Sequence, residues 1–113
     1  LGVLWEQVTG GPLPLGVIAA RRDLDFATHR AIEAVLRASI EIAQSEPALP
    51  REYVRAHAQE LSEDVCNRHI GLYVNEFSVD LGARGREAIE ELLRRGRALG
   101  LLPQGPSVFR GGA

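Results

Sequence analysis

One stretch dominates the hydrophobic pattern of the chain, the sequence GPLPLGVIAARRDL at residues 11–24. Its apolar centre, Leu15 to Ala20, contains Val17 and Ile18, and the glycine and proline residues before it favour a strand over a helix. Apolar side chains on both faces are typical of a strand that is buried on both sides. Such a strand needs neighbours on both edges, because unpaired backbone groups are costly away from water. The rest of the chain predicts no second strand of this quality, so we expect these 113 residues to belong to a larger fold.

The other apolar positions recur every three or four residues, which predicts helices. The expected helices cover residues 1–8, 26–45, 51–61, about 63–73 and about 83–99. Asp25 and Ser62 are expected N-caps, Pro50 a first helical residue, and Gly10 a left-handed C-terminal cap. Residues 75–82 are expected to form a connector. The pattern therefore predicts a mostly helical chain whose apolar faces must cover a sheet.

Charged residues at a spacing of four predict ion pairs on the outer side of two helices. The expected pairs are Glu33–Arg37, Glu90–Arg94 and Glu91–Arg95. The net charge of −2 gives no electrostatic case for binding nucleic acid or an anionic membrane. No apolar run approaches the roughly 20 residues that a membrane span requires. A single cysteine, Cys66, excludes an internal disulfide and a thiolate metal cluster, and it fits a reducing cytoplasm.

The candidates for acid–base or metal chemistry are few. His29, His57 and His69 lie outside any His-x-x-x-His or Glu-x-x-His pattern, and each is interpreted first as a residue of a helix face. The chain contains no P-loop, dinucleotide-binding or nucleophile-elbow motif. Residue spacing alone therefore indicates no self-contained catalytic constellation.

Three segments resemble a known family. They are GPLPLGVIAARRDL at residues 11–24, REYVRAHAQEL at 51–61 and HIGLYVNEFSVDLGARGREAIEELL at 69–93. Together they are similar to the C-terminal part of the 1,4-dihydroxy-6-naphthoate synthases, lyase-type enzymes of the futalosine route of menaquinone biosynthesis. The chain is less similar to the chorismate dehydratases of the same route. Members of the family are much longer than this chain, so the resemblance covers only their later part.

The resemblance implies an α/β fold of two lobes, like that of type II periplasmic binding proteins. Residues 1–11 would then end the second lobe, residues 12–102 would supply the return strand and the helices of the first lobe, and residues 103–113 would form a flexible tail. The family releases 1,4-dihydroxy-6-naphthoate from cyclic dehypoxanthine futalosine, with no metal or organic cofactor. Its histidine base would lie upstream of Leu1, so no catalytic residue is assigned here, and the chain alone is expected to be inactive.

The expected substrate-binding positions are Leu15 and Gly16 at the crossover between lobes, where strand ends meet a crevice. Tyr73 and Asn75 are further candidates because their polar tips lie at a helix end, and capping and packing are the alternative roles. The expected partners are a small-molecule substrate and the missing N-terminal half of the protein, or a second copy of the chain. Two other hypotheses remain open, a solute-binding lobe without catalysis and a helical interaction domain. The coding sequence upstream of Leu1 would separate them.

Overall fold

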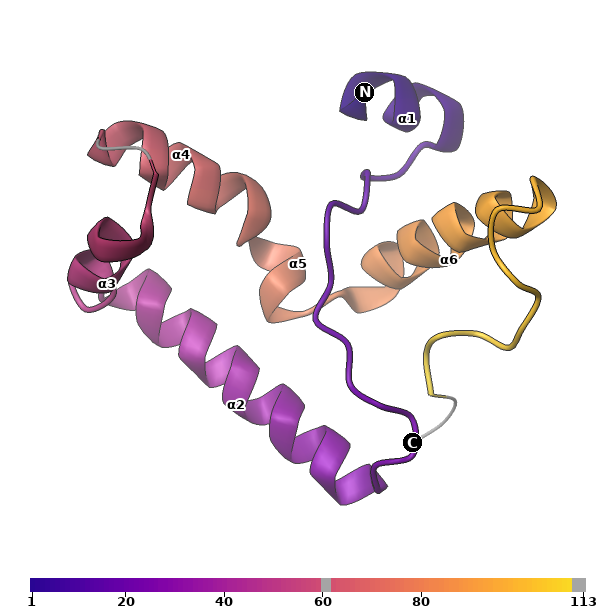
Figure 1. The fold of residues 1–113 in the computed structure, drawn as a ribbon, viewed down its shortest axis with the longest axis horizontal. Coiled ribbons are helices and arrows are strands. Elements are labelled where there is room, and N and C mark those ends of the chain that lie inside the picture. Colours follow the sequence, from indigo (N-terminus) through magenta and orange to yellow (C-terminus); the bar gives the residue numbers. More distant parts are fainter. Residues whose placement is uncertain (60–61, 111–113) are drawn as a thin grey trace. The chain divides into compact units, whose positions relative to one another are not determined.

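A computed structural model describes residues 1–59 and 62–110, and the regular structure within these ranges is helical. The helices are α1 (Gly2–Thr9), α2 (Phe26–Ser45), α3 (Arg51–His57), α4 (Glu63–Tyr73), α5 (Glu76–Val79) and α6 (Gly82–Ala98), drawn in chain order in Figure 1. The chain divides into two compact units. The α1–α6 unit contains residues 1–22 and the chain from Leu81 onward, and the α2–α5 unit contains Asp23–Asp80. Each is described by itself.

Helix α1 ends at a glycine, as its sequence predicts. Gly10 has a φ of 72°, the left-handed conformation that glycine adopts without a Cβ clash, and its N–H donates to Glu6 O. In the same unit, the chain reverses direction after α6 ends at Ala98, and the side chain of Leu102 packs against Gly96. A Cβ added at Gly96 would lie 2.7 Å from Leu102 Cδ1, so a larger residue here would make the Leu102 side chain move.

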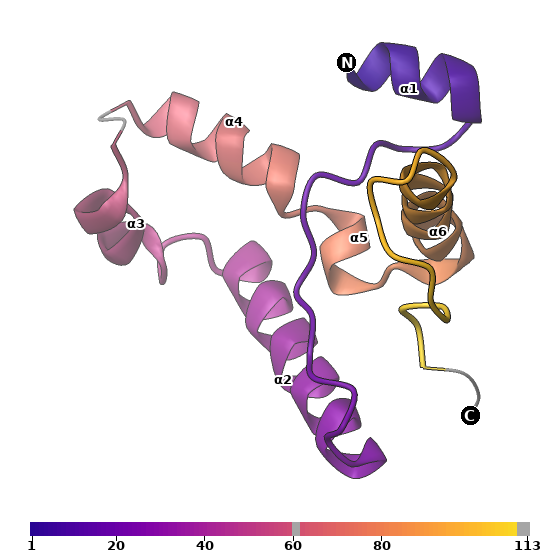
Figure 2. The same cartoon turned by 45° about the vertical axis from the view of Figure 1, so that its right-hand side comes forward.

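The buried strand predicted over Leu15–Ala20 is wrong for this chain. Residues 12–20 follow α1 without regular secondary structure, and Figure 2 shows them as a plain tube continuing from α1. The side chains of Leu15, Val17 and Ile18 are 49%, 60% and 74% exposed. A strand exists only when its backbone groups pair with a neighbour, and residues 1–59 and 62–110 supply no second strand. The one-strand α/β description is therefore corrected to a helical one, and the two-lobe fold stays a prediction.

Helix caps in the α2–α5 unit confirm two predictions. The Asp25 carboxylate accepts the N–H of Thr28 at 2.8 Å and begins α2, and the Ser62 hydroxyl accepts the N–H of Val65 at the start of α4. Helix α3 ends at His57, earlier than predicted, and the predicted end at Leu61 lies outside the described residues. Pro50 stands at the N-cap of α3 and not at its first position.

The predicted connector over residues 75–82 contains one turn of helix, α5, and is corrected accordingly. Helix α5 contacts α2 within this unit. Arg37 on α2 binds Glu33 one turn earlier and Asp80 just after α5, both at 3.5 Å. The expected Glu33–Arg37 pair is thus confirmed. These two ion pairs are largely exposed, so each adds little to stability.

Very little of the described chain is buried. Ala88 on α6, 7% exposed, is the one buried apolar residue among the described residues, and its neighbour on the same face is the buried Gly85. The apolar stripes that periodicity predicts do exist, but large side chains such as Leu4 and Tyr53 are more than half exposed. No helix in the described ranges is both long and apolar enough to cross a membrane.

Candidate functional site

A cleft of about 560 Å³ lies within the α1–α6 unit, between the end of α1 and one face of α6. Thr9, Gly10 and Gly11 line one side of it. The other side is the α6 face formed by Arg84, Glu87, Ala88, Glu90, Glu91, Arg94 and Arg97. Residues three or four apart on a helix share a face, which is why this charged set meets the end of α1 together.

The charges on the lining of the cleft cancel. The α6 face carries three arginines, Arg84, Arg94 and Arg97, and three glutamates, Glu87, Glu90 and Glu91. An anion or a cation would therefore gain no net attraction from these lining residues. The lining of the cleft therefore shows no bias toward a ligand of one charge.

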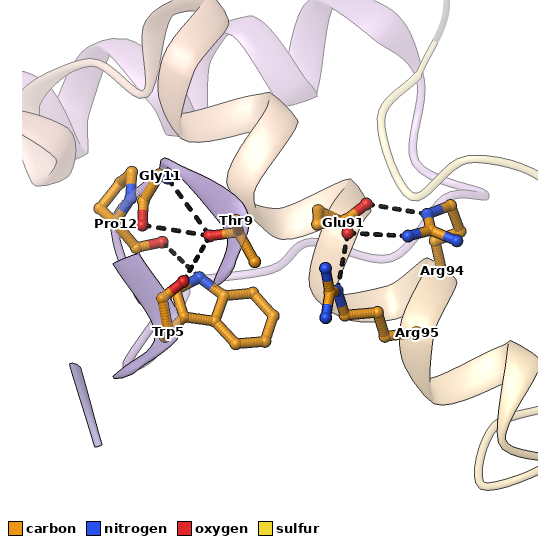
Figure 3. Close-up of polar contacts among 7 residues, drawn as sticks. All are labelled: Trp5, Thr9, Gly11, Pro12, Glu91, Arg94 and Arg95. Atoms are coloured by element: carbon orange, nitrogen blue, oxygen red, sulfur yellow. Dashed lines mark hydrogen bonds and ion pairs between the residues drawn. The ribbon is translucent and has the colours of Figure 1, made fainter. Parts of the chain in front are cut away.

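Glu91 is the most strongly held group of the cleft. Its carboxylate accepts from Arg94 Nε and Nη2 at 2.8 and 2.7 Å and from Arg95 Nε at 2.7 Å (Figure 3). The hydrogen bonds from Arg94 and then Arg95 lower the pKa of Glu91 from 4.5 to about 2. A carboxylate with so low a pKa is a weak proton acceptor at neutral pH, so Glu91 suits a structural role better than that of a general base.

The ion-pair predictions for α6 are confirmed in part. Glu91 does bind Arg95, as the spacing of four predicts. Arg94, expected on Glu90, binds Glu91 instead, and Glu90 accepts a hydrogen bond from the Ser107 hydroxyl. Spacing alone allows partners both three and four residues away, so it does not decide between Glu90 and Glu91 as the partner of Arg94.

A compact hydrogen-bonded turn follows α1. The Thr9 hydroxyl donates to Trp5 O at 2.8 Å and accepts the N–H of Gly11 at 3.2 Å. The indole Nε1 of Trp5 donates to Pro12 O at 3.1 Å, and Figure 3 shows these contacts converging on the turn. The Arg95 guanidinium lies 5.6 Å from the centre of the Trp5 ring, a cation–π distance. This cluster is not predicted from the sequence, in which its only local signal is the spacing of four between Trp5 and Thr9.

The predicted substrate residues of the crossover do not line the cleft. Leu15 is 49% exposed, and a Cβ added at Gly16 would meet no atom within 4 Å. Both belong to the α1–α6 unit, a few residues beyond the turn that forms one wall of the cleft. Their role in binding stays a prediction.

The other predicted pair, Tyr73 and Asn75, belongs to the α2–α5 unit. Tyr73 is half exposed, and its ring centre lies 4.8 Å from that of His69. Asn75 caps α5: its Oδ1 accepts the N–H of Phe77 at 3.0 Å, and its Nδ2 donates to Leu72 O at 3.2 Å. The capping role left open for Asn75 is confirmed, and its role in binding a substrate stays a prediction.

Two of the histidines, His57 and His69, are exposed and contact tyrosine rings. His57 is exposed, stacks on Tyr53 with ring centres 4.1 Å apart, and places Nδ1 2.8 Å from Tyr53 O. His69 packs against Tyr73, as described above. Within residues 1–59 and 62–110, no group of three or more histidine, cysteine or acidic side chains could hold a metal ion.

Comparison with known proteins identifies relatives along nearly the whole chain. A family described as menaquinone biosynthesis matches residues 1–98. A 1,4-dihydroxy-6-naphthoate synthase from Streptomyces coelicolor is 48% identical over 110 residues, which is 96% of this chain and 39% of that protein. The enzyme of the same name from Thermus thermophilus is 45% identical over 106 residues, 94% of this chain and 39% of its own. The chain thus spans about 39% of the length of these curated relatives.

Proposed function

Because the chain belongs to the menaquinone biosynthesis family, we propose that it forms the C-terminal part of a 1,4-dihydroxy-6-naphthoate synthase. The observation that carries this proposal is the similarity to two enzymes of that name along nearly all of the chain. The enzyme would release 1,4-dihydroxy-6-naphthoate from cyclic dehypoxanthine futalosine. The step would be a lyase-type cleavage that begins with abstraction of a proton from the substrate.

The proton acceptor is proposed to lie in the part of the enzyme that precedes this chain. An imidazole suits the task because its pKa lies near neutral pH. Within the described residues, His57 and His69 are engaged with Tyr53 and Tyr73 on helix surfaces, outside the cleft. Glu91 faces the cleft, but its low pKa makes it a poor base. The C-terminal part would therefore shape and support the active site, and the N-terminal part would supply its reacting groups.

The two-lobe fold is proposed to form when the N-terminal part pairs with residues 12–20. These residues carry mostly apolar side chains, and Leu15, Val17 and Ile18 are about half exposed or more. Exposed apolar segments with free strand edges are the sites at which other strands add. About three fifths of each curated relative lies outside the matched region, which leaves ample chain to supply those strands. A cytoplasmic location is proposed for the complete enzyme, since a single cysteine fits a reducing compartment.

The test is to assay the full-length protein that contains this sequence with cyclic dehypoxanthine futalosine and to identify the product by chromatography and mass spectrometry. Formation of 1,4-dihydroxy-6-naphthoate is the expected result. Binding of the substrate without turnover would overturn the proposal in favour of a solute-binding protein. Turnover of chorismate instead would place the protein with the chorismate dehydratases. The 113-residue chain, assayed beside it, is expected to give no product.

A further inference from the structure

We propose that Trp5 is a positioning residue. It would fix the start of residues 12–20, called the crossover segment below, and thereby the location of the predicted substrate-binding residues Leu15 and Gly16. The inference rests on the proposed function for its effect on substrate. Its structural basis lies within the α1–α6 unit alone. It consists of two connections, one from α6 to Trp5 and one from Trp5 to the turn that follows α1.

The first connection fixes the indole ring against α6. Arg95 places its guanidinium 5.6 Å from the ring centre of Trp5 and donates through Nε to Glu91 at 2.7 Å. Glu91 is in turn held by two hydrogen bonds from Arg94. The hydrogen bond to Glu91 therefore restrains the Arg95 guanidinium at its place beside the Trp5 ring (Figure 3). The ring of Trp5 is therefore held by α6 as well as by its own helix.

The second connection fixes the turn to the indole. The Nε1 of Trp5 donates to Pro12 O at 3.1 Å, and the Thr9 hydroxyl joins Trp5 O to the N–H of Gly11. Gly10 supplies the left-handed step, with a φ of 72°, that lets the chain leave α1 at this angle. The carbonyl of Pro12 is thus anchored at the first residue of the crossover.

Pro12 and Pro14 restrict the backbone that follows α1. Pro12 and Pro14 have fixed φ angles, and the residue before each is restricted to extended conformations. The segment from Pro12 to Pro14, which starts at the anchored carbonyl, therefore has few accessible conformations. We expect a shift at Pro12 to move Leu15 and Gly16 as well. This is why an indole some distance from those residues can set their position.

The test uses the full-length enzyme with Trp5→Phe, which keeps an aromatic ring beside Arg95 but removes the Nε1 donor and one of the two rings of the indole. Losing one neutral hydrogen bond corresponds to about a two- to tenfold change in an equilibrium constant. We expect KM for cyclic dehypoxanthine futalosine to rise about two- to tenfold, with kcat changed less than twofold. Arg95→Gln, which frees the ring from α6, should raise KM in the same way. Gln7→Ala, an exposed position on the same helix, is the matched control and should leave both constants unchanged.

Hydrogen exchange of the peptide covering residues 11–18 gives a second readout that does not depend on activity. Trp5→Phe should speed exchange there and leave peptides of α2 unchanged. An unchanged KM together with unchanged exchange would overturn the proposal. A lower kcat together with a lower melting temperature, without a rise in KM, would also overturn it, because this result would indicate a purely structural tryptophan. If the wild-type enzyme fails to turn over the substrate, the proposed function is refuted. Faster exchange in Trp5→Phe would still support the proposal that Trp5 positions residues 12–20.

Discussion

The side chain of Asn75 caps the N-terminus of α5. Variants of this residue therefore test whether its role is capping or substrate binding. Replacing Asn75 with alanine removes the acceptor for the N–H of Phe77 and the donor to Leu72 O. Loss of an N-cap lowers the free energy of unfolding by about 1 kcal/mol. We expect Asn75→Ala to lower the denaturation midpoint of the full-length enzyme accordingly and to leave KM unchanged.

Two further variants make that result specific. Asn75→Asp keeps an oxygen that accepts from the N–H of Phe77 and should restore most of the stability. Asn67→Ala removes the same side chain from an exposed position inside α4, where alanine favours the helix. It should not destabilise the protein. A rise in KM for Asn75→Ala, with the denaturation midpoint unchanged, would contradict the capping role and favour substrate binding.

The carboxylate of Glu91 gives a prediction about pH. Its pKa is about 2 in the folded protein because Arg94 and Arg95 donate to it, against an ordinary value of 4.5. A lowered pKa means that the stabilisation is fully present above about pH 4.5 and is lost as the pH falls toward 2. Glu91→Gln should therefore lower the melting temperature of the full-length enzyme at pH 7, and the gap from wild type should close as the pH approaches 2.

Glu87→Gln is the control for this pH profile. Glu87 lies on the same helix and lines the same cleft, and the structure shows no ion pair for it among the described residues. Its variant should follow the wild-type melting curve at every pH. A Glu91→Gln variant whose deficit is constant between pH 7 and pH 3 would show that the two arginines do not lower the Glu91 pKa.

Among the elements, the helices could be predicted from sequence because their signals are local. Asp25 and Ser62 cap α2 and α4 as predicted, and Gly10 ends α1 with the expected left-handed φ. Each of these signals acts within about four residues. The short helix α5 was missed because one helical turn is too short to show periodicity, although the Asn75 cap before it was a local signal.

The strand prediction was wrong because a strand depends on distant partners, and the cleft between α1 and α6 was not predicted for the same reason. Residues 15–20 have the composition of a strand, but pairing needs a second strand that the described chain does not supply. The cleft forms where the end of α1 meets α6, and Trp5 meets Arg95 across 90 positions of sequence. No local pattern links two such positions, so the sequence did not indicate this cleft. The substrate-binding roles expected for Leu15, Gly16, Tyr73 and Asn75 stay predictions.

A proline placed in the crossover segment distinguishes a loop from a strand of a larger sheet. Proline inside a central strand removes a ladder hydrogen bond and costs about 3 kcal/mol or more. We expect Val17→Pro to lower the melting temperature of the full-length enzyme strongly. In the isolated chain, where residues 12–20 lie outside regular structure, it should leave the helix content measured by circular dichroism unchanged.

Val17→Thr is the matched variant, because it keeps the β-branched shape and the backbone N–H. It should cost the full-length enzyme much less than Val17→Pro does. If the proline variant melts at the wild-type temperature in the full-length enzyme, residues 15–20 form no central strand there. The proposed pairing with the N-terminal part would then fail.

At the level of the whole molecule, the main feature is the number of large apolar side chains that are exposed to water. Large apolar side chains on α1, residues 12–20, α2 and α4 are more than half exposed, among them Val3, Ile18, Val35 and Leu72. Proteins that exist as monomers rarely leave large contiguous apolar patches in water. The match to about 39% of each curated relative indicates where cover could come from, since those proteins contain a further region.

The isolated 113-residue chain should therefore associate with itself or aggregate, with residues 15–20 as the main contact. The apolar side chains of Leu15, Val17 and Ile18 and the unpaired backbone between them invite pairing with another copy. Sedimentation velocity should show dimers or larger species, and Ile18→Lys should shift them toward monomer because a charge on the exposed segment opposes pairing. Addition of the separately expressed N-terminal part should also reduce self-association and restore turnover. A wild-type chain that sediments as a cooperative, soluble monomer would show that these residues form a complete domain and would refute the proposed role of the crossover segment.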